Sequence, residues 1–146
     1  MTLPTHLMAG LVLGKITGNY SLSLAGAVLV DADHIFSYTK AKILFRPKEL
    51  WRTLTDKNDP YGDQRYFLHN FFVFILITGT SAFINLQTGL IVGLAYLSHL
   101  ILDALDDADY FPFFPNKKIN LRGPIGYFSK SEFVFALFFL LIYVLI

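Results

Sequence analysis

The sequence predicts an all-α fold, a polytopic membrane helical bundle with a short N-terminal helical hairpin and a metal site at the helix ends. Two features of composition favour this class: 54% of the 146 residues are hydrophobic and only 16% are charged, against about 25% charged in soluble chains. The mean hydropathy is +0.50. A third feature is that each of the four histidines lies at or near the end of an apolar segment. We expect one membrane-embedded domain over residues 1–146 and no signal peptide, since a basic leader is lacking.

The first apolar segment, Leu3–Val30, has two interpretations. It is either one helix of about 25 residues or two shorter helices joined at Thr17–Tyr20. We favour the hairpin because Gly18 and Asn19 tolerate the left-handed backbone of a helix end, and Ser21 is a plausible N-cap for the second helix. The choice decides whether His6 and Asp33, at the two ends of the segment, can belong to one site. Only a hairpin brings both ends to the same side of the membrane.

Three further apolar segments follow. Tyr66–Leu86 and Thr88–Leu105 have the length of a spanning helix, about 17–25 residues, whereas Ser131–Ile146 is marginal. The two long polar stretches, Ser37–Arg65 and Asp106–Lys130, carry seven and four of the twelve basic residues. Because basic loops tend to stay in the cytoplasm, we expect a multi-pass protein of the cell (inner) membrane with the helix-end site facing the cytoplasm.

The charge and cysteine counts narrow the possible partners. A formal net charge of +1 gives no reason to expect nucleic-acid binding, and the absence of cysteine excludes disulfides and thiolate zinc sites. Membrane lipid is the expected partner, and the sequence carries no signal for an oligomeric state. The motifs GxSxG, HExxH and a Gly-rich phosphate loop are also absent.

His99 and Asp103 form the strongest local motif. Residues at i and i+4 share a helix face, so an imidazole and a carboxylate at this spacing can hold one metal ion. A polar pair that caps a helix bundle is the alternative. Ionisable residues within a membrane segment are costly and usually functional.

A second motif, Asp31-Ala32-Asp33-His34, closes the first apolar segment. Two carboxylates followed by a histidine can bind or bridge metal ions, although a solvated acidic helix end has the same pattern. His6 and His69 mean little alone, but in the hairpin arrangement they lie at the same level as the other candidates. The candidate metal ligands are therefore His6, Asp33, His34, His69, His99 and Asp103. Nitrogen and oxygen ligands without sulfur suit Zn²⁺ best, and Mn²⁺ or Fe²⁺ are compatible.

These motifs together resemble a known family. An early TH-x-x-x-G, a D-x-D-H, an isolated histidine in mid-chain and an SHLxLD followed by a Pro-Phe segment look like the YdjM-type membrane-bound metal-dependent hydrolases. That family is similar to the zinc-dependent phospholipase C and P1-type nuclease group. The resemblance implies a metal site in which His6, Asp33, His69, His99 and Asp103 are ligands, and Asp31 and His34 are further candidates. Related phosphoesterases use two or three zinc ions to activate water.

The expected function is that of a membrane-bound metal-dependent hydrolase, with a phosphoester, and possibly a phospholipid, as substrate. Its metal lowers the pKa of bound water toward about 7, and Asp31 or Asp33 acts as the catalytic base where it is not a ligand. The alternative is a non-catalytic membrane scaffold or partner-binding protein with a structural metal site, which four protein ligands close.

Overall fold

The computed structural model describes residues 1–55 and 65–146. Lys57, one of the basic residues of the first polar stretch, lies outside this part of the chain. The described residues form helices and loops, and no β-strand occurs among them. The helices, in chain order, are α1 (Leu3–Thr17), α2 (Tyr20–Val28), the 3₁₀ turn η1 (Leu29–Asp31), α3 (Ala32–Lys40), α4 (Pro47–Thr55), α5 (Phe71–Ile84), α6 (Leu86–Leu105) and α7 (Lys130–Leu145). The predicted all-α class is confirmed for these residues.

The first apolar segment folds as two packed helices, α1 and α2, so the hairpin interpretation is confirmed. Gly18 ends α1 with φ of 70°, a left-handed conformation that suits glycine. The predicted N-cap at Ser21 is wrong. Asn19 caps α2 instead, because its side-chain oxygen accepts a hydrogen bond from the Leu22 amide at 3.1 Å, and the helix begins one residue later, at Tyr20.

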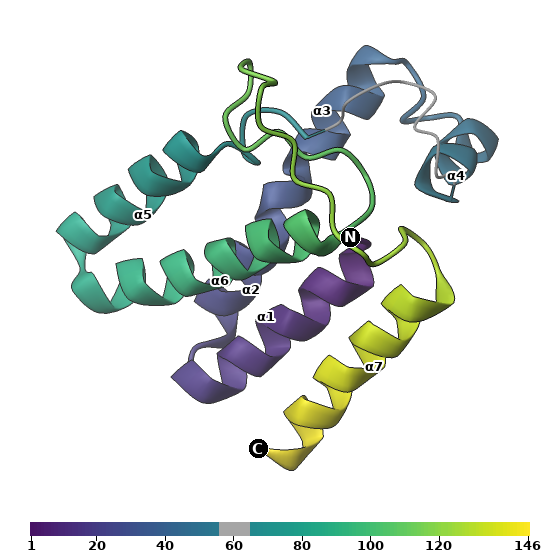
Figure 1. Cartoon of the computed structure of the whole chain (residues 1–146). Helices are drawn as coiled ribbons and strands as arrows, with labels where there is room; N and C mark the ends of the chain where they lie inside the picture. Colours follow the sequence, from purple (N-terminus) through teal and green to yellow (C-terminus); the bar gives the residue numbers. More distant parts are fainter. Residues whose placement is uncertain (56–64) are drawn as a thin grey trace.

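Helix α6 is the centre of the bundle and packs against α1, α2 and α5 (Figure 1). The approach of α2 is close because Gly26 faces α6. A Cβ atom at that position would lie 2.8 Å from the Ala95 Cβ atom and 2.9 Å from the Val92 carbonyl oxygen. Small residues permit such close helix contacts where both partners are apolar. The α2–α6 contact fixes the end of α2, and with it η1, beside the last turns of α6.

Helix α7 packs along α1, and a buried glutamate joins their first turns. Glu132 is 3% exposed and accepts hydrogen bonds from the Thr2 and Phe128 amides at 2.5 and 2.7 Å. The Thr5 hydroxyl donates to the same carboxylate at 3.3 Å. The start of α1 is thereby held at the end of the bundle where α6 finishes.

The evidence for membrane spans is strongest at α6. Among the described helices, it alone is long and apolar enough to cross a bilayer, with 20 residues. Helix α5 has 14 residues, about 21 Å at 1.5 Å per residue, against a hydrocarbon core of about 30 Å. It is shorter than the predicted segment because Asn70 caps it and residues 67–69 form a bend and a turn before it. A multi-pass arrangement therefore stays a prediction. Apolar side chains nevertheless cover the outside of the bundle, among them Leu76, Phe83, Leu90, Leu94, Phe133, Phe138 and Leu141.

Candidate metal centre

Histidine and aspartate side chains from several elements meet at one end of the bundle. This is the end where α1 begins and α6 finishes, opposite the turns at Gly18 and Asn85 and the C-terminus (Figure 1). The ligand-type atoms form three overlapping groups, and within each group they lie within 4.8 Å of one another. The groups are His69, His99 and Asp103; His6, Asp31 and His99; and Asp31, His34 and His69.

The innermost group is His69, His99 and Asp103, all fully buried. The two Nε2 atoms of His69 and His99 are 3.2 Å apart. Oδ2 of Asp103 lies 3.2 Å from the Nε2 atom of His69 and 3.5 Å from that of His99. This buried oxygen has no hydrogen-bond partner. An unpaired buried carboxylate oxygen is costly unless a cation neutralises it.

The opposite nitrogens of the two rings fix which atoms face the centre. Nδ1 of His99 lies 2.7 Å from the Ala27 carbonyl oxygen, and Nδ1 of His69 lies 3.1 Å from Oδ2 of Asp33. Both oxygens are acceptors, so both Nδ1 atoms carry the proton. In the neutral rings, each Nε2 therefore presents a lone pair. Two lone pairs and a carboxylate oxygen directed at one point are the arrangement of a metal site whose histidines are oriented from behind.

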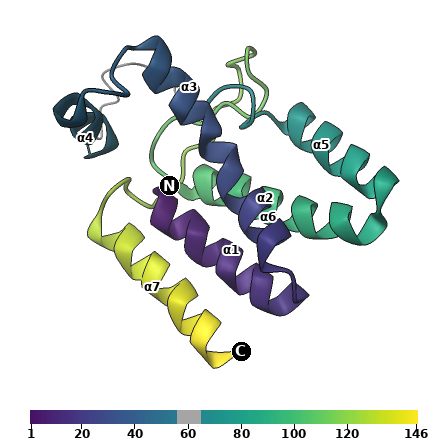
Figure 2. The ribbon, with the colours of Figure 1, turned by 180° about the vertical axis from the view of Figure 1, so that it is seen from behind.

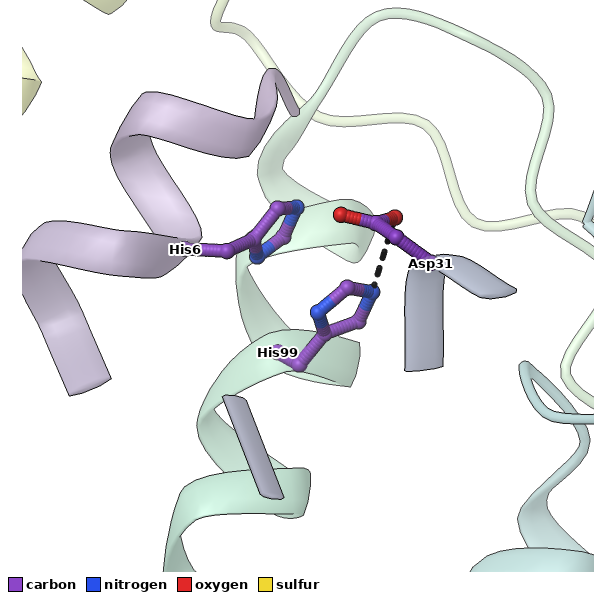
Figure 3. Close-up of side chains that lie close together, drawn as sticks. All are labelled: His6, Asp31 and His99. Carbon is purple, nitrogen blue, oxygen red and sulfur yellow. Dashed lines mark ion pairs between the residues drawn. The ribbon is translucent and has the colours of Figure 1, made fainter. Parts of the chain in front are cut away.

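His6 adds a third imidazole on the α1 side. Its ring stacks on that of His99, with centroids 3.7 Å apart and planes 17° apart. Its Nε2 atom lies 3.3 Å from Oδ1 of Asp103, while its Nδ1 atom is buried without a partner. Figure 3 shows His6 and His99 with Asp31, whose carboxylate lies 3.7 Å from Nε2 of His99. The α1–α2 hairpin is what brings His6 and Asp31 together.

Asp31 and His34 form the accessible side of the cluster. Their side chains are 17% and 24% exposed, and Nε2 of His34 lies 3.2 Å from Oδ1 of Asp31. Burial by itself raises the pKa of Asp31, but the hydrogen bond from His34 and the nearby imidazoles outweigh it and lower that pKa to about 2. Asp31 is thus a carboxylate at neutral pH, and it is reached from outside the bundle.

The cluster carries an excess of negative charge. Four carboxylates lie in it, those of Asp31, Asp33, Asp103 and Asp106. The guanidinium of Arg65 is buried and contacts Oδ1 of Asp103 at 3.2 Å and Oδ2 of Asp106 at 3.0 Å. The ammonium group of Met1 contacts the same two carboxylates at 2.5 and 2.6 Å. Two cations against four carboxylates leave the histidine side of the cluster in need of positive charge.

The pKa of His69 reflects the same field. Burial disfavours the charged imidazolium, but the adjacent carboxylates of Asp103 and Asp33 outweigh it and raise the pKa of His69 above its ordinary value. The carboxylates that attract a proton to this ring also attract a metal ion.

A comparison with protein families identifies the family of the chain. All of its residues, 1–146, match the family described as YdjM inner membrane protein. The chain belongs to this family. Comparisons with curated proteins and with solved structures found no match. The family supports a membrane protein, and the similarity to zinc-dependent phospholipase C and P1 nuclease stays a prediction.

The structure brings most of the predicted site residues of this YdjM-family chain together. His6, His34, His69, His99 and Asp103 all contribute to the ligand-type groups, as does Asp31. Asp33 belongs to none of these groups. It lies behind His69 and accepts hydrogen bonds from the Leu68 amide at 2.7 Å and the His69 amide at 3.3 Å, besides its contact with the ring.

The sequence did not lead us to expect two buried charged residues beside the cluster, Arg65 and Glu132. Arg65 stands at the end of a basic run, and Glu132 at the start of an apolar helix, where an acid is expected from the helix dipole alone. A usable signal for Arg65 was the excess of carboxylates in the predicted ligand set, which requires a fixed cation nearby.

Proposed function

We propose that this YdjM-family protein is a membrane-bound metal-dependent hydrolase that acts on a phosphoester, with the phosphate of a lipid headgroup as the favoured substrate. One observation carries the proposal. The buried Oδ2 atom of Asp103 has no hydrogen-bond partner and faces the unprotonated Nε2 atoms of His69 and His99 at 3.2 and 3.5 Å. A divalent cation resolves this accumulation of lone pairs.

The donors favour Zn²⁺, with Mn²⁺ and Fe²⁺ as compatible ions, because they are imidazole nitrogens and carboxylate oxygens only. His69, His99 and Asp103 are the proposed central ligands. His6, Asp31 and His34 offer further donors on two sides of them. Six donors exceed the four that close a structural zinc site, which supports open coordination positions or more than one ion. We assign Asp33 to positioning, since it holds the proton on Nδ1 of His69.

When bound, a metal ion held by His69, His99 and Asp103 would supply an activated water and polarise the phosphoryl group. Asp31 is the proposed base, because it is reached from outside and its Oδ1 atom is oriented by Nε2 of His34. Asp33 is less suited to this role, since three donors already occupy its Oδ2 atom. The buried walls of the cluster, including His6 and His99, exclude bulk water from the rest of the site.

A lipid substrate is supported by the place of the cluster in the fold. It lies at the end of the bundle, beside the last turn of α6, the helix suited to spanning. Such an end meets the headgroup region of a bilayer. The basic polar stretches at this end support a cytoplasmic orientation under the positive-inside rule, and this orientation is part of the proposal.

The second candidate function is a membrane scaffold whose metal is structural. Its supporting observation is the complete burial of His6, His99 and Asp103, which resembles a closed site more than an open one. The partial exposure of Asp31 and His34 is what favours catalysis.

The first test is the metal content of the purified full-length protein in detergent. We expect stoichiometric Zn²⁺ or Mn²⁺ in the wild type and in an Asp107→Asn control, and loss of metal in His99→Ala and Asp103→Ala. Asp107 makes a comparable control because its carboxylate accepts a backbone hydrogen bond, from Tyr127 at 2.7 Å, outside the cluster.

Activity is then measured on phosphomonoesters, phosphodiesters and phospholipids with the metal-loaded protein. Hydrolysis that disappears in Asp31→Asn, with metal retained, supports the proposed base. Wild-type protein that binds no metal after reconstitution with Zn²⁺ and Mn²⁺ refutes the hydrolase. Bound metal without hydrolysis of any substrate class favours the scaffold.

A further inference from the structure

Helices α3 and α4 project from the end of the bundle, away from α1, α5 and α7, in both views (Figures 1 and 2). Their surface is basic. Between Ala32 and Thr55, five exposed side chains are cationic: Lys40, Lys42, Arg46, Lys48 and Arg52. The whole polar stretch Ser37–Arg65 has seven basic residues and four acidic ones. We call residues 32–55 the α3–α4 surface.

The same surface exposes large apolar side chains. Phe45 is 92% exposed and Phe36 and Trp51 are each 66% exposed. In α4 the apolar residues recur at 47, 50, 51 and 54, the spacing of one helix face. Thr53, which lies away from that face, is the buried residue of the helix. Helix α4 therefore buries the side that carries Thr53, while Trp51 and Leu54 are exposed.

A hydrogen bond ties this arrangement to the core structure. The Tyr127 hydroxyl donates to the Leu54 carbonyl oxygen at 3.0 Å, so the loop before α7 holds the last turn of α4. Ile43, in the turn between α3 and α4, is buried at 1% exposure. The outward apolar face thus belongs to a packed element.

We propose that the α3–α4 surface is an interfacial element that binds anionic phospholipid headgroups. Amphipathic helices with Lys and Arg beside Trp, Phe and Leu lie in the headgroup region, with the aromatic rings at the acyl boundary and the cations on lipid phosphates. The charge of the surface matches anionic lipids, and its exposed rings match the bilayer interface. The chain belongs to a family described as inner membrane proteins, which supports a bilayer as the partner of this surface.

The position of this surface relates it to the metal centre. Helix α3 starts at Ala32, directly after Asp31, and carries His34 in its first turn. Asp31 and His34 are the partly exposed residues of the cluster. Lipid held at the α3–α4 surface therefore lies next to the accessible side of the site. The lipid-binding inference needs neither metal nor hydrolysis, so it stands or fails separately from the proposed function.

Trp51 provides the test, because it is the only tryptophan in the chain. The full-length protein is reconstituted in nanodiscs of phosphatidylcholine alone or with phosphatidylglycerol, and tryptophan emission and its quenching by brominated lipid are measured. We expect bluer emission and stronger quenching in the anionic discs. The difference should shrink in high salt, since the Debye length falls from about 10 Å at 0.1 M to about 3 Å at 1 M.

Charge variants separate binding from folding. Replacing Lys40, Lys48 and Arg52 by Gln should remove the difference between the two kinds of disc. Replacing Lys117, Lys118 and Lys130 by Gln, the same number of exposed charges on another segment, should leave it intact. Equal emission and quenching of wild-type Trp51 in both kinds of disc overturns the inference. So does a response to duplex or single-stranded DNA in place of lipid.

Discussion

Substituting Asp33 by Asn tests whether the cluster is a metal site with histidines oriented from behind. The Asp33 carboxylate accepts hydrogen bonds from the Leu68 amide at 2.7 Å and from Nδ1 of His69 at 3.1 Å. The Leu68 amide, the His69 amide and Nδ1 of His69 all contact the same oxygen, Oδ2, so an asparagine with its amide oxygen in that place preserves the turn before α5. The neutral amide, however, lacks the negative charge with which the carboxylate supports the imidazole from behind. The Nε2 atom of His69 is then a weaker ligand for a cation.

The expected loss of metal affinity is about 10- to 100-fold, the range for partners that orient a metal-bound histidine, or about 1.4–2.8 kcal/mol. Competition for Zn²⁺ with a chelating dye measures this on the purified protein in detergent. Asp107→Asn is the matched control, since its carboxylate accepts the Tyr127 amide at 2.7 Å but touches no ligand. Unchanged Zn²⁺ affinity in Asp33→Asn, beside a loss in His99→Ala, would refute the role of Nε2 of His69.

Three further outcomes follow from packing and charge. In Gly26→Val, even the Cβ atom would lie only 2.8 Å from the Ala95 Cβ atom, so this variant should lower the free energy of unfolding, measured by thermal unfolding, by about 1–3 kcal/mol. A Cβ atom at Gly79 would have no other atom within 4 Å, so Gly79→Val should cause no such loss. Arg65→Met leaves Asp103 and Asp106 buried without their guanidinium and should cost about 3–5 kcal/mol in denaturant unfolding; wild-type stability would contradict the buried ion pair. Saturating metal at 100 times its Kd should stabilise the protein by about 2.7 kcal/mol, an increment that chelation removes from the wild type and that His99→Ala lacks.

The sequence was sufficient to predict the helical class and the convergence of the histidines. Both rest on strong local signals. Apolar segments mark the helices, and Gly18 with Asn19 marks the reversal that returns the chain to the level of His6. Each histidine lies at or near the end of an apolar segment. Because the connection at Asn85 is short, α5 and α6 run antiparallel, and the start of α5 lies at the same end of the bundle as the end of α6.

The sequence alone could not show that Asp31 lies among the ligand-type atoms whereas Asp33 contacts Nδ1 of His69 from behind. Whether either residue faces the centre depends on the 3₁₀ turn η1, which separates α2 from α3 and sets the two carboxylates in different directions. Helix boundaries are the least predictable feature of a sequence because caps compete within a residue or two, as Asn19 and Ser21 do here.

The α1–α2 hairpin also sets the order in which the site is completed during synthesis. The candidate ligands lie between residues 6 and 103, on α1, on the segment from η1 to α3, in the turn before α5 and on α6. The hairpin alone holds only His6 and Asp31 together, and His69 emerges before its partner His99. The centre is therefore complete only after α6 has left the ribosome and packed against α2. In the proposed metal-dependent hydrolase, an ion would therefore bind only after this packing step.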